Sequence, residues 1–207
     1  MTDPDGSYVY YTPDGPDRPR RSPLKAIVAP RPIAWVSTIS AEGVGNLAPY
    51  SFFNLINDRP PMLAFSSVGY KDSARNIAET GDFAVSIATR GLAEQMNLSS
   101  QDHPASVDEF DLAGLARRAS RAINAPGVDG SPAILECRAV EVRQLTDIDR
   151  NPIDTWLVIG QVVGVHILAD CFVDGTFRTE IARPILRAGY ADEYWEIGPD
   201  GLFRMGR

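Results

Sequence analysis

The chain has 207 residues, of which 44% are hydrophobic and 23% are charged. These fractions are typical of a globular protein, and they exclude a chain disordered throughout, a coiled coil and a collagen. A chain of this length buries enough surface to fold without a disulfide or a metal ion. It contains no run of about 20 apolar residues, so no segment is predicted to span a bilayer.

The net charge of −7 disfavours nucleic acid as a partner, because an acidic chain repels phosphate backbones at long range. The sequence has two cysteines and two histidines. Their positions give neither a disulfide framework nor the spacing of a metal site, and we expect no metal. The N-terminus lacks the basic and apolar pattern of a secretory signal, which predicts a cytoplasmic protein.

The beginning of the chain differs in composition from the rest, with prolines at positions 4, 13, 16, 19 and 23. Proline removes backbone donors and fixes φ, which predicts an extended arm over residues 1–23. The arm carries Tyr8, Tyr10 and Tyr11, which suggest that it docks on another surface, such as a neighbouring subunit. We expect one domain over residues 24–190 and a tail over residues 191–207.

In the first half of the domain, short segments rich in β-branched and aromatic residues predict strands. They cover residues 33–39, 46–56, 61–66 and 82–88. Pro49 interrupts the second of them, which indicates an edge strand or a bulge. Helices are predicted over 74–80, with Asp72 or Ser73 as N-cap and Gly81 after the last turn, and over 91–98. Residues 99–130 are predicted to leave the sheet, with one short helix near 111–118.

The second half adds predicted strands over 133–143, 155–168 and 172–177. Gly160 and Gly164 in the long apolar strand predict a bend or a bulge, as barrels require. Many short strands, few helices and no regular βαβ alternation predict a mainly antiparallel barrel or sandwich, and we favour the barrel. No G-x-G-x-x-G follows a strand, which argues against a Rossmann fold.

The tripeptide Lys71-Asp72-Ser73 opens a predicted helix. Helix N-termini bind anions through free N–H groups and a partial positive charge. Lys71, the Ser73 hydroxyl and the free amides of Ala74 and Arg75 would together hold one phosphate. An ordinary helix start with a solvated lysine would have the same sequence, so this motif alone leaves both interpretations open.

Two adjacent predicted strands carry small and hydroxylated residues among large apolar ones: Ser37, Thr38, Ala48 and Ser51. Interrupted pairing at Pro49 would free backbone amides to bind the oxygens of a flat ligand. Alternatively, Trp35, Phe52 and Phe53 are core aromatics, and composition does not decide between the two.

The sequence resembles the flavin reductase-like proteins, which have an FMN-binding split barrel of the flavoredoxin and flavin reductase type. The segments that carry the resemblance occur in the same order: residues 31–54, 60–67, 71–87, 108–115, 131–137, 162–167 and 182–190. The resemblance implies a six-stranded antiparallel split barrel with a few added helices, acting as a homodimer that binds FMN near the subunit interface. Residues 116–130 follow the family pattern only loosely, so the substrate is left open.

By this resemblance, Lys71, Asp72 and Ser73 would hold the FMN phosphate, in agreement with the helix-start argument. The remaining contacts to the flavin ring, the ribityl chain or the phosphate would come from Arg31, Trp35, Val36, Ser37, Thr38, Ala48, Pro49, Tyr50, Ser51, Asn54, Ser66 and Ser67. For Arg31, an exposed surface position is the alternative. No catalytic residue is assigned firmly.

His166 has two interpretations. A neutral imidazole there would contact the nicotinamide side of the site, whereas a histidine in an apolar strand is more often a core or interface residue. Because a flavin itself accepts the electrons, we expect an oxidoreductase that NADH or NADPH reduces. It would pass electrons to free flavin, a monooxygenase partner or another acceptor. The alternative is a flavoredoxin-like electron carrier that acts on protein partners without nicotinamide turnover.

Overall fold

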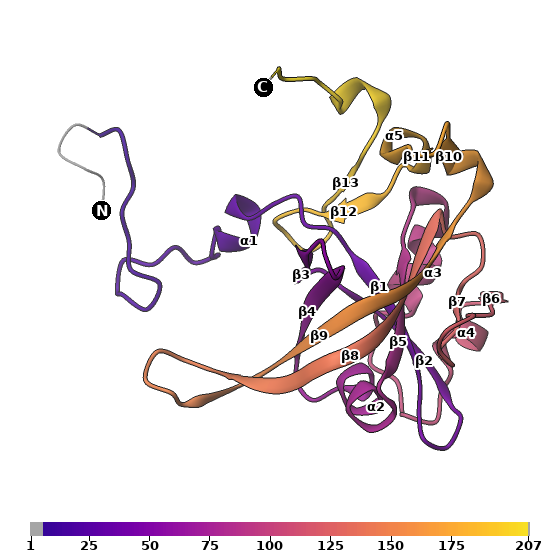
Figure 1. The fold of residues 1–207 in the computed structure, drawn as a ribbon. Helices are drawn as coiled ribbons and strands as arrows, with labels where there is room; N and C mark the ends of the chain where they lie inside the picture. The colour runs from indigo at the N-terminus through magenta and orange to yellow at the C-terminus, as the bar shows by residue number, and fades with distance from the viewer. Residues whose placement is uncertain (1–5, 207) are drawn as a thin grey trace.

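The structure is a computed structural model that describes residues 6–206 (Figure 1). The first five residues of the predicted arm and the last residue of the predicted tail lie outside the described residues. The helices are α1 (Leu24–Ile27), α2 (Asp72–Thr80), α3 (Ala93–Leu98), α4 (Glu109–Leu112) and α5 (Thr179–Ala182), with 3-10 turns η1 (Arg90–Leu92), η2 (Ala169–Cys171) and η3 (Pro199–Gly201).

The seven strands of the main sheet are β1 (Ala34–Ile39), β2 (Gly45–Tyr50), β3 (Phe53–Asn57), β4 (Met62–Val68), β5 (Asp82–Ile87), β8 (Ala133–Thr146) and β9 (Pro152–Ile167). Three two-stranded ribbons complete the described part of the chain: β6 (Arg117–Arg118) with β7 (Gly127–Val128), β10 (Phe172–Val173) with β11 (Thr176–Phe177), and β12 (Ile185–Arg187) with β13 (Tyr194–Glu196).

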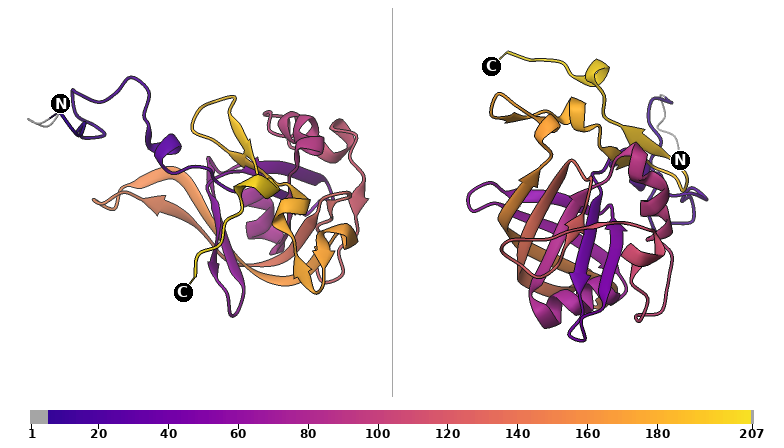
Figure 2. Two further views of the ribbon diagram at one scale, coloured as in Figure 1. Left: turned by 90° about the horizontal axis from the view of Figure 1, so that it is seen from above. Right: turned by 90° about the vertical axis from the view of Figure 1, so that its right-hand side faces the viewer.

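The main sheet has the order β2-β1-β5-β8-β9-β4-β3, and every neighbouring pair is antiparallel. Strands β2 and β3 lie at opposite edges, yet only Ser51 and Phe52 separate them in the chain. The sheet therefore curls, and the Ser66 amide of β4 donates to the Phe52 carbonyl over 2.9 Å, which extends the β3–β4 pairing to the connecting residues. Figure 2 shows the resulting barrel. The predicted split barrel is confirmed, with seven strands in the curled sheet rather than six.

The predicted segment 46–56 is two strands, because the chain crosses from one edge to the other at Ser51. Pro49 lies inside β2, where it pairs with Trp35 of β1 and needs no partner on its open side. The edge position that Pro49 indicated is confirmed. The break itself falls two residues later than the proline.

Strand β1 is buried on both faces, and its hydroxyl side chains at Ser37 and Thr38 are buried along with the apolar ones. Successive side chains of a strand point to opposite faces. Val36 packs inside the barrel with Phe65 and Phe83. Trp35 points outward into a second core, which lies beneath the helical segments and contains Leu47, Met96, Phe110 and Ile185.

Two predicted helices begin at other residues than expected. Lys71, not Asp72 or Ser73, is the N-cap of α2, while Gly81 ends the helix with a φ of +79° as predicted. The short helix of the 99–130 excursion is α4 and not 111–118. It starts earlier because the Asp108 carboxylate accepts a hydrogen bond from the Phe110 amide over 2.9 Å.

Strands β8 and β9 form a long hairpin that projects from the barrel (Figure 1). Their register shifts where Glu136 faces Gly164 and Cys137 faces Val162, so β9 is bulged beside Gly164 as predicted. The predicted strand over 172–177 is a hairpin, in which Asp174 and Gly175 form the turn that joins β10 to β11. At the C-terminal end, β13 of the predicted tail returns to pair with β12.

Candidate functional site

The candidate site follows the open edge of β2 and consists of adjoining cavities, which we call the β2 groove. Strand β2 pairs with β1 on one side only. On its other side, the Leu47 amide donates to a carboxylate oxygen of Glu109 over 2.9 Å, and Pro49 has no N–H to donate. This edge therefore offers small side chains and little competing backbone pairing, which lets a flat molecule approach it closely.

The first cavity, of about 240 Å³, lies at the N-terminal end of α2. Its wall is formed by Asn46, Ala48, Pro49, Tyr50, Lys71, Asp72, Ser73, Glu109 and residues 99–103. No side chain caps α2. The first-turn amides of a nine-residue helix therefore face this cavity region without a side-chain acceptor, which favours an anion there.

Lys71 adds a positive charge at this helix end. Its Nζ donates to Asp102 Oδ1 over 2.8 Å, and this hydrogen bond raises the pKa of Lys71 above its ordinary value. The lysine is therefore cationic at neutral pH. The Asp102 side chain is 90% exposed, so its contact with Lys71 is readily exchanged for another anion.

Ser73 is held in place by buried polar neighbours. Asn46 Nδ2 donates to Ser73 Oγ over 2.9 Å and to Thr38 Oγ1 over 3.1 Å. Asn76 Nδ2 donates to the same Thr38 oxygen over 3.0 Å. Tyr50 lines the same cavity, and burial raises the pKa of its phenol above the ordinary value. The wall of the cavity is therefore pre-organised.

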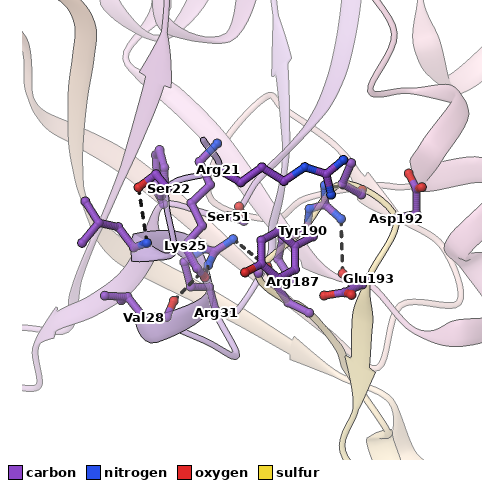
Figure 3. A pocket seen from close by; sticks show the side chains of 15 residues that line it. Arg21, Ser22, Lys25, Val28, Arg31, Ser51, Arg187, Tyr190, Asp192 and Glu193 are labelled. Atoms are coloured by element: carbon purple, nitrogen blue, oxygen red, sulfur yellow. Dashed lines mark hydrogen bonds between the residues drawn. The ribbon is translucent and has the colours of Figure 1, made fainter. Parts of the chain in front are cut away.

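Three further cavities continue from the first one. One of about 190 Å³ shares Pro49 and Ser100 with it and also touches Ser51 and Arg187. The largest, of about 1200 Å³, is lined by Ser51, Phe52, Arg31 and Arg187 together with segments 21–28 and 188–193 (Figure 3). The last, of about 510 Å³, contains the predicted residues Arg31, Ser51, Asn54 and Ser66. Volumes of this order suit a small organic ligand.

The other residues predicted for the site lie behind the wall of the groove. The side chains of Trp35, Val36, Ser37, Thr38 and Ser67 are fully buried. Trp35 Nε1 donates to Ser99 Oγ over 2.9 Å, and the Ser37 hydroxyl donates to the carbonyl of Pro126. These hydrogen bonds join β1 to the 99–130 excursion, part of which lines the groove.

His166 is placed against Glu136 rather than in the β2 groove. Its Nε2 contacts Glu136 Oε1, and the same carboxylate accepts from the amides of Arg121 and Ala122 over 2.8 and 2.6 Å. Glu136 is 1% exposed. Burial acts to raise the pKa of Glu136, but these hydrogen bonds outweigh it and hold the pKa below its ordinary value. The pair fastens the 116–130 excursion to the barrel.

Sequence reasoning missed three parts of the groove: Glu109, the 99–103 segment and Arg187. Glu109 is buried, and burial raises the pKa of its carboxyl group. No local pattern marks it, because its role depends on an edge strand 62 residues earlier in the chain. Arg187 lies inside a segment that carried the family resemblance, but its partner Arg31 is near the other end of the domain sequence, and only the fold brings them together.

Within residues 6–206, no helix is long and apolar enough to cross a membrane. The same residues contain no cluster of three or more His, Cys, Asp or Glu side chains suited to a metal ion. Cys137 and Cys171 are buried and unpaired by disulfides, and burial raises both thiol pKa values.

A curled antiparallel barrel with an open edge and an anion-suited helix end defines the class of the flavin-related split-barrel proteins. Residues 28–179 match the family model "Flavin reductase like domain". The chain belongs to this family, which places it among flavin-related oxidoreductases.

Relatives of known sequence or structure resemble most of the chain. An uncharacterized protein of Deinococcus radiodurans is 40% identical over 168 residues, covering 77% of this chain and 71% of the relative. The crystal structure of nitrilotriacetate monooxygenase component B from Bacillus cereus is 29% identical, with a TM-score of 0.84, and covers 96% of this chain and 100% of that one. The 2-nitrobenzoate 2-nitroreductase of Pseudomonas fluorescens is 26% identical, with a TM-score of 0.78 and coverages of 89% and 88%.

Proposed function

We propose that the protein binds FMN in the β2 groove and is an FMN-dependent oxidoreductase that NADH or NADPH reduces. The observation that carries the proposal is the uncapped start of α2, where Lys71 and Ser73 meet at the end of a groove that continues to Ser51. An anion site joined to a larger, partly apolar space fits a phosphate joined to a flat ring. In this proposal the phosphate lies at α2, and the ring lies beyond Pro49.

The donor set of the first cavity fits a phosphate. The Lys71 ammonium, the Ser73 hydroxyl and the first-turn amides of α2 surround it, and Asn46 keeps Ser73 in position. The remaining predicted contacts follow from this orientation. Ala48, Pro49, Tyr50 and Ser51 would flank the ribityl chain and the ring, and Arg31, Asn54 and Ser66 would lie at the far end, while Trp35, Val36, Ser37, Thr38 and Ser67 would support the wall.

When bound, FMN supplies a ring that accepts a hydride and releases electrons singly or in pairs. The chain's own residues bind, orient and partly enclose that ring, so no catalytic acid is required. The two similar structures suggest what receives the electrons. One is component B of a monooxygenase, which supports free flavin for an oxygenase partner, and the other is a nitroreductase, which supports an organic acceptor.

The test is an anaerobic visible absorption spectrum of the purified protein, first with FMN and then with NADH or NADPH. We expect flavin bands that shift on binding and bleach with a reduced nicotinamide. Steady-state oxidation of NAD(P)H with added free flavin then measures turnover. If the protein does not bind FMN, the proposed FMN site is wrong. If FMN binds but NADH and NADPH do not bleach it, the proposed nicotinamide donor is wrong.

The second candidate function is an electron carrier that exchanges electrons with a protein partner. The net charge of −7 favours it, because an acidic surface docks readily on a basic partner. Rapid turnover with NAD(P)H and free flavin excludes the carrier. Tight FMN binding with reduction by a protein donor alone supports it.

We also propose a homodimer, as the resemblance implied. Tyr8 of the arm is 73% exposed, and Val165 on the outer face of β9 is 57% exposed. The arm and the β8–β9 hairpin both extend from the barrel, which leaves surfaces that a second copy would cover (Figures 1 and 2). Light scattering coupled to size-exclusion chromatography gives the mass directly, and a monomer at micromolar concentration contradicts this proposal.

A further inference from the structure

Two arginines face each other at the far end of the β2 groove. The Arg31 amide donates to the Arg187 carbonyl over 2.9 Å, and the Arg187 amide donates to the Arg31 carbonyl over 2.8 Å. Residues that exchange both backbone hydrogen bonds lie directly opposite each other, with their side chains on the same side. Like charges in this position destabilise the pairing. The electrostatic repulsion between Arg31 and Arg187 therefore lowers the stability of the fold, and the two backbone hydrogen bonds do not require charged side chains at these positions.

Nothing within residues 6–206 neutralises this pair of charges. The Arg31 guanidinium donates to three carbonyls, those of Lys25, Val28 and Ala188, the last two over 2.9 and 3.1 Å. The Arg187 guanidinium donates to the carbonyls of Ala191 and Glu193, and it lies 4.6 Å from the ring of Tyr194. Every one of these hydrogen-bond partners is neutral, so neither guanidinium has an ion-pair partner in the described part of the chain.

Arg31 is only 8% exposed, and its buried Nε has no hydrogen-bond partner. A buried charge with an unused donor is costly unless a partner of opposite charge is present. Burial, and then the charge of Arg187, lower the pKa of Arg31. Guanidinium groups bind carboxylates and phosphates through paired hydrogen bonds, so the missing partner is an oxyanion.

The surrounding cavity is suited to an organic anion. Arg21 and Lys25 line it beside Arg31 and Arg187, and Figure 3 shows these cationic side chains around the same space. Asp192 and Glu193 also line it, but both are exposed. Apolar contact area is provided by Leu24, Val28, Phe52 and Tyr190. A ligand with an anionic group on a flat or apolar body would contact both the cationic and the apolar side chains of this cavity.

We infer that Arg31 and Arg187 form an oxyanion subsite for the electron donor or acceptor, which therefore carries a carboxylate or a phosphate. The inference rests on the proposed function, because the subsite adjoins the part of the groove assigned to the flavin ring. The two anions come from different sources: a carboxylate from a small organic acid, and a phosphate from a dinucleotide.

The test uses isothermal titration calorimetry with four probes, on the protein with and without FMN. Benzoate is compared with neutral benzamide, and ADP with uncharged adenosine. We expect at least one anion to bind about tenfold or more tightly than its neutral analogue, the scale of one charge-assisted hydrogen bond. The benzoate pair reports an organic acid, and the ADP pair reports a dinucleotide.

Arg187→Gln removes one charge at a half-buried position, so it keeps the fold more readily than a change at buried Arg31. In this variant, we expect the ratio of the anion's affinity to that of its neutral analogue to fall close to one. Arg59→Gln is the matched control, because Arg59 is 94% exposed in the β3–β4 connection, and it should keep the preference. Equal binding of anion and neutral analogue in the wild type, or an unchanged preference in Arg187→Gln, overturns the inference.

A third comparison separates this subsite from the flavin phosphate. FMN and riboflavin differ by the phosphate alone, and we expect Arg187→Gln to weaken both equally or neither. If it weakens FMN but not riboflavin, the anion at Arg187 is the flavin's own phosphate and the inference is wrong. If the proposed function itself is wrong, neither the wild type nor either variant binds FMN, and this outcome differs from those that overturn the subsite.

Discussion

Asn46 Nδ2 lies 2.9 Å from Ser73 Oγ, and this hydrogen bond joins the open strand β2 to the first turn of α2. Both side chains are buried. The contact fixes the helix end relative to the strand edge, and these are the two features that would bind the two ends of an FMN molecule. A ligand that meets a pre-organised site loses less free energy to ordering.

The first prediction concerns the phosphate end of the groove. Lys71→Ala with Ser73→Ala removes the cationic side chain and the hydroxyl at the start of α2. We expect FMN affinity to fall at least about tenfold, because charge-assisted hydrogen bonds to the phosphate are lost. Riboflavin, which has no phosphate, should bind with nearly unchanged affinity. Flavin fluorescence titration measures both.

Arg59→Ala is the control for that pair, since it removes an exposed charge from a side chain that does not line the first cavity. It should leave both affinities unchanged. An FMN affinity that survives the double substitution would mean that the phosphate lies elsewhere.

The second prediction concerns Glu109, a buried carboxyl group in the wall of the same cavity. Glu109→Gln keeps an oxygen that accepts from the Leu47 amide but removes the negative charge. We expect FMN to bind a few-fold more tightly relative to riboflavin at pH 7, because like-charge repulsion of the phosphate disappears. Glu94→Gln, an exposed position on the neighbouring α3, changes the net charge equally and should have no effect.

The pH dependence at Glu109 has a defined sign. Burial raises its pKa above the ordinary value of 4.5, so the folded state favours the protonated form. The associated stabilisation is full below pH 4.5 and is lost as the pH rises through the raised pKa. The advantage of Glu109→Gln in FMN binding should therefore shrink as the pH is lowered toward 4.5. A pH-independent difference would contradict the electrostatic explanation.

The parts of the fold that the sequence predicted are those with a local cause. The segment from Trp35 to Ile39 is rich in β-branched and aromatic residues, as expected for the buried strand β1, and Gly81 ends α2 because its φ is positive. The N-cap of α2 was placed one or two residues too late, because Asp72 and Ser73 both belong to residue types that favour the N-cap position. In the folded chain, Asp72 forms an ion pair with Arg75 and Ser73 bonds Asn46 instead.

The parts that the sequence did not predict depend on contacts between distant segments. Glu136 looks like an outward-facing residue of an alternating strand, yet it is buried by the 116–130 excursion. The family resemblance implied that Trp35 and Thr38 contact the ligand, with a core position as the alternative for Trp35, and both side chains are fully buried. Their burial depends on segments from the second core and from α2, which no pattern within β1 reveals.

The third prediction concerns the attachment of that excursion. Glu136→Gln removes the anion that accepts hydrogen bonds from Arg121, Ala122 and His166. We expect the free energy of unfolding at pH 7 to fall by about 1–3 kcal/mol, because buried donors lose a charged acceptor. Urea unfolding measures this change. Glu79→Gln, an exposed substitution on α2 with the same charge change, should be close to neutral.

The pH dependence at Glu136 has the opposite sign to that at Glu109. Its pKa lies below the ordinary value of 4.5, so the folded state favours the carboxylate. That stabilisation is present above pH 4.5 and is lost as the pH falls through the lowered pKa. The difference in unfolding free energy between wild type and Glu136→Gln should therefore narrow in acid. A constant difference at all pH values would mean that shape, and not charge, carries the effect.

The last prediction tests why β9 contains glycine at position 160. Gly160 lies opposite Ala139 of β8, and a Cβ atom added there would meet the ring of Phe83, with Cε1 at 2.6 Å. Phe83 is fully buried in the barrel core, so its ring has no free space to enter. We expect Gly160→Ala to destabilise the protein by about 1–3 kcal/mol through overpacking, measured by urea unfolding. Gly198→Ala is the matched control, because nothing lies within 4 Å of its added Cβ. If both substitutions have equal effects, the glycine is explained by backbone flexibility and not by the close approach of Phe83.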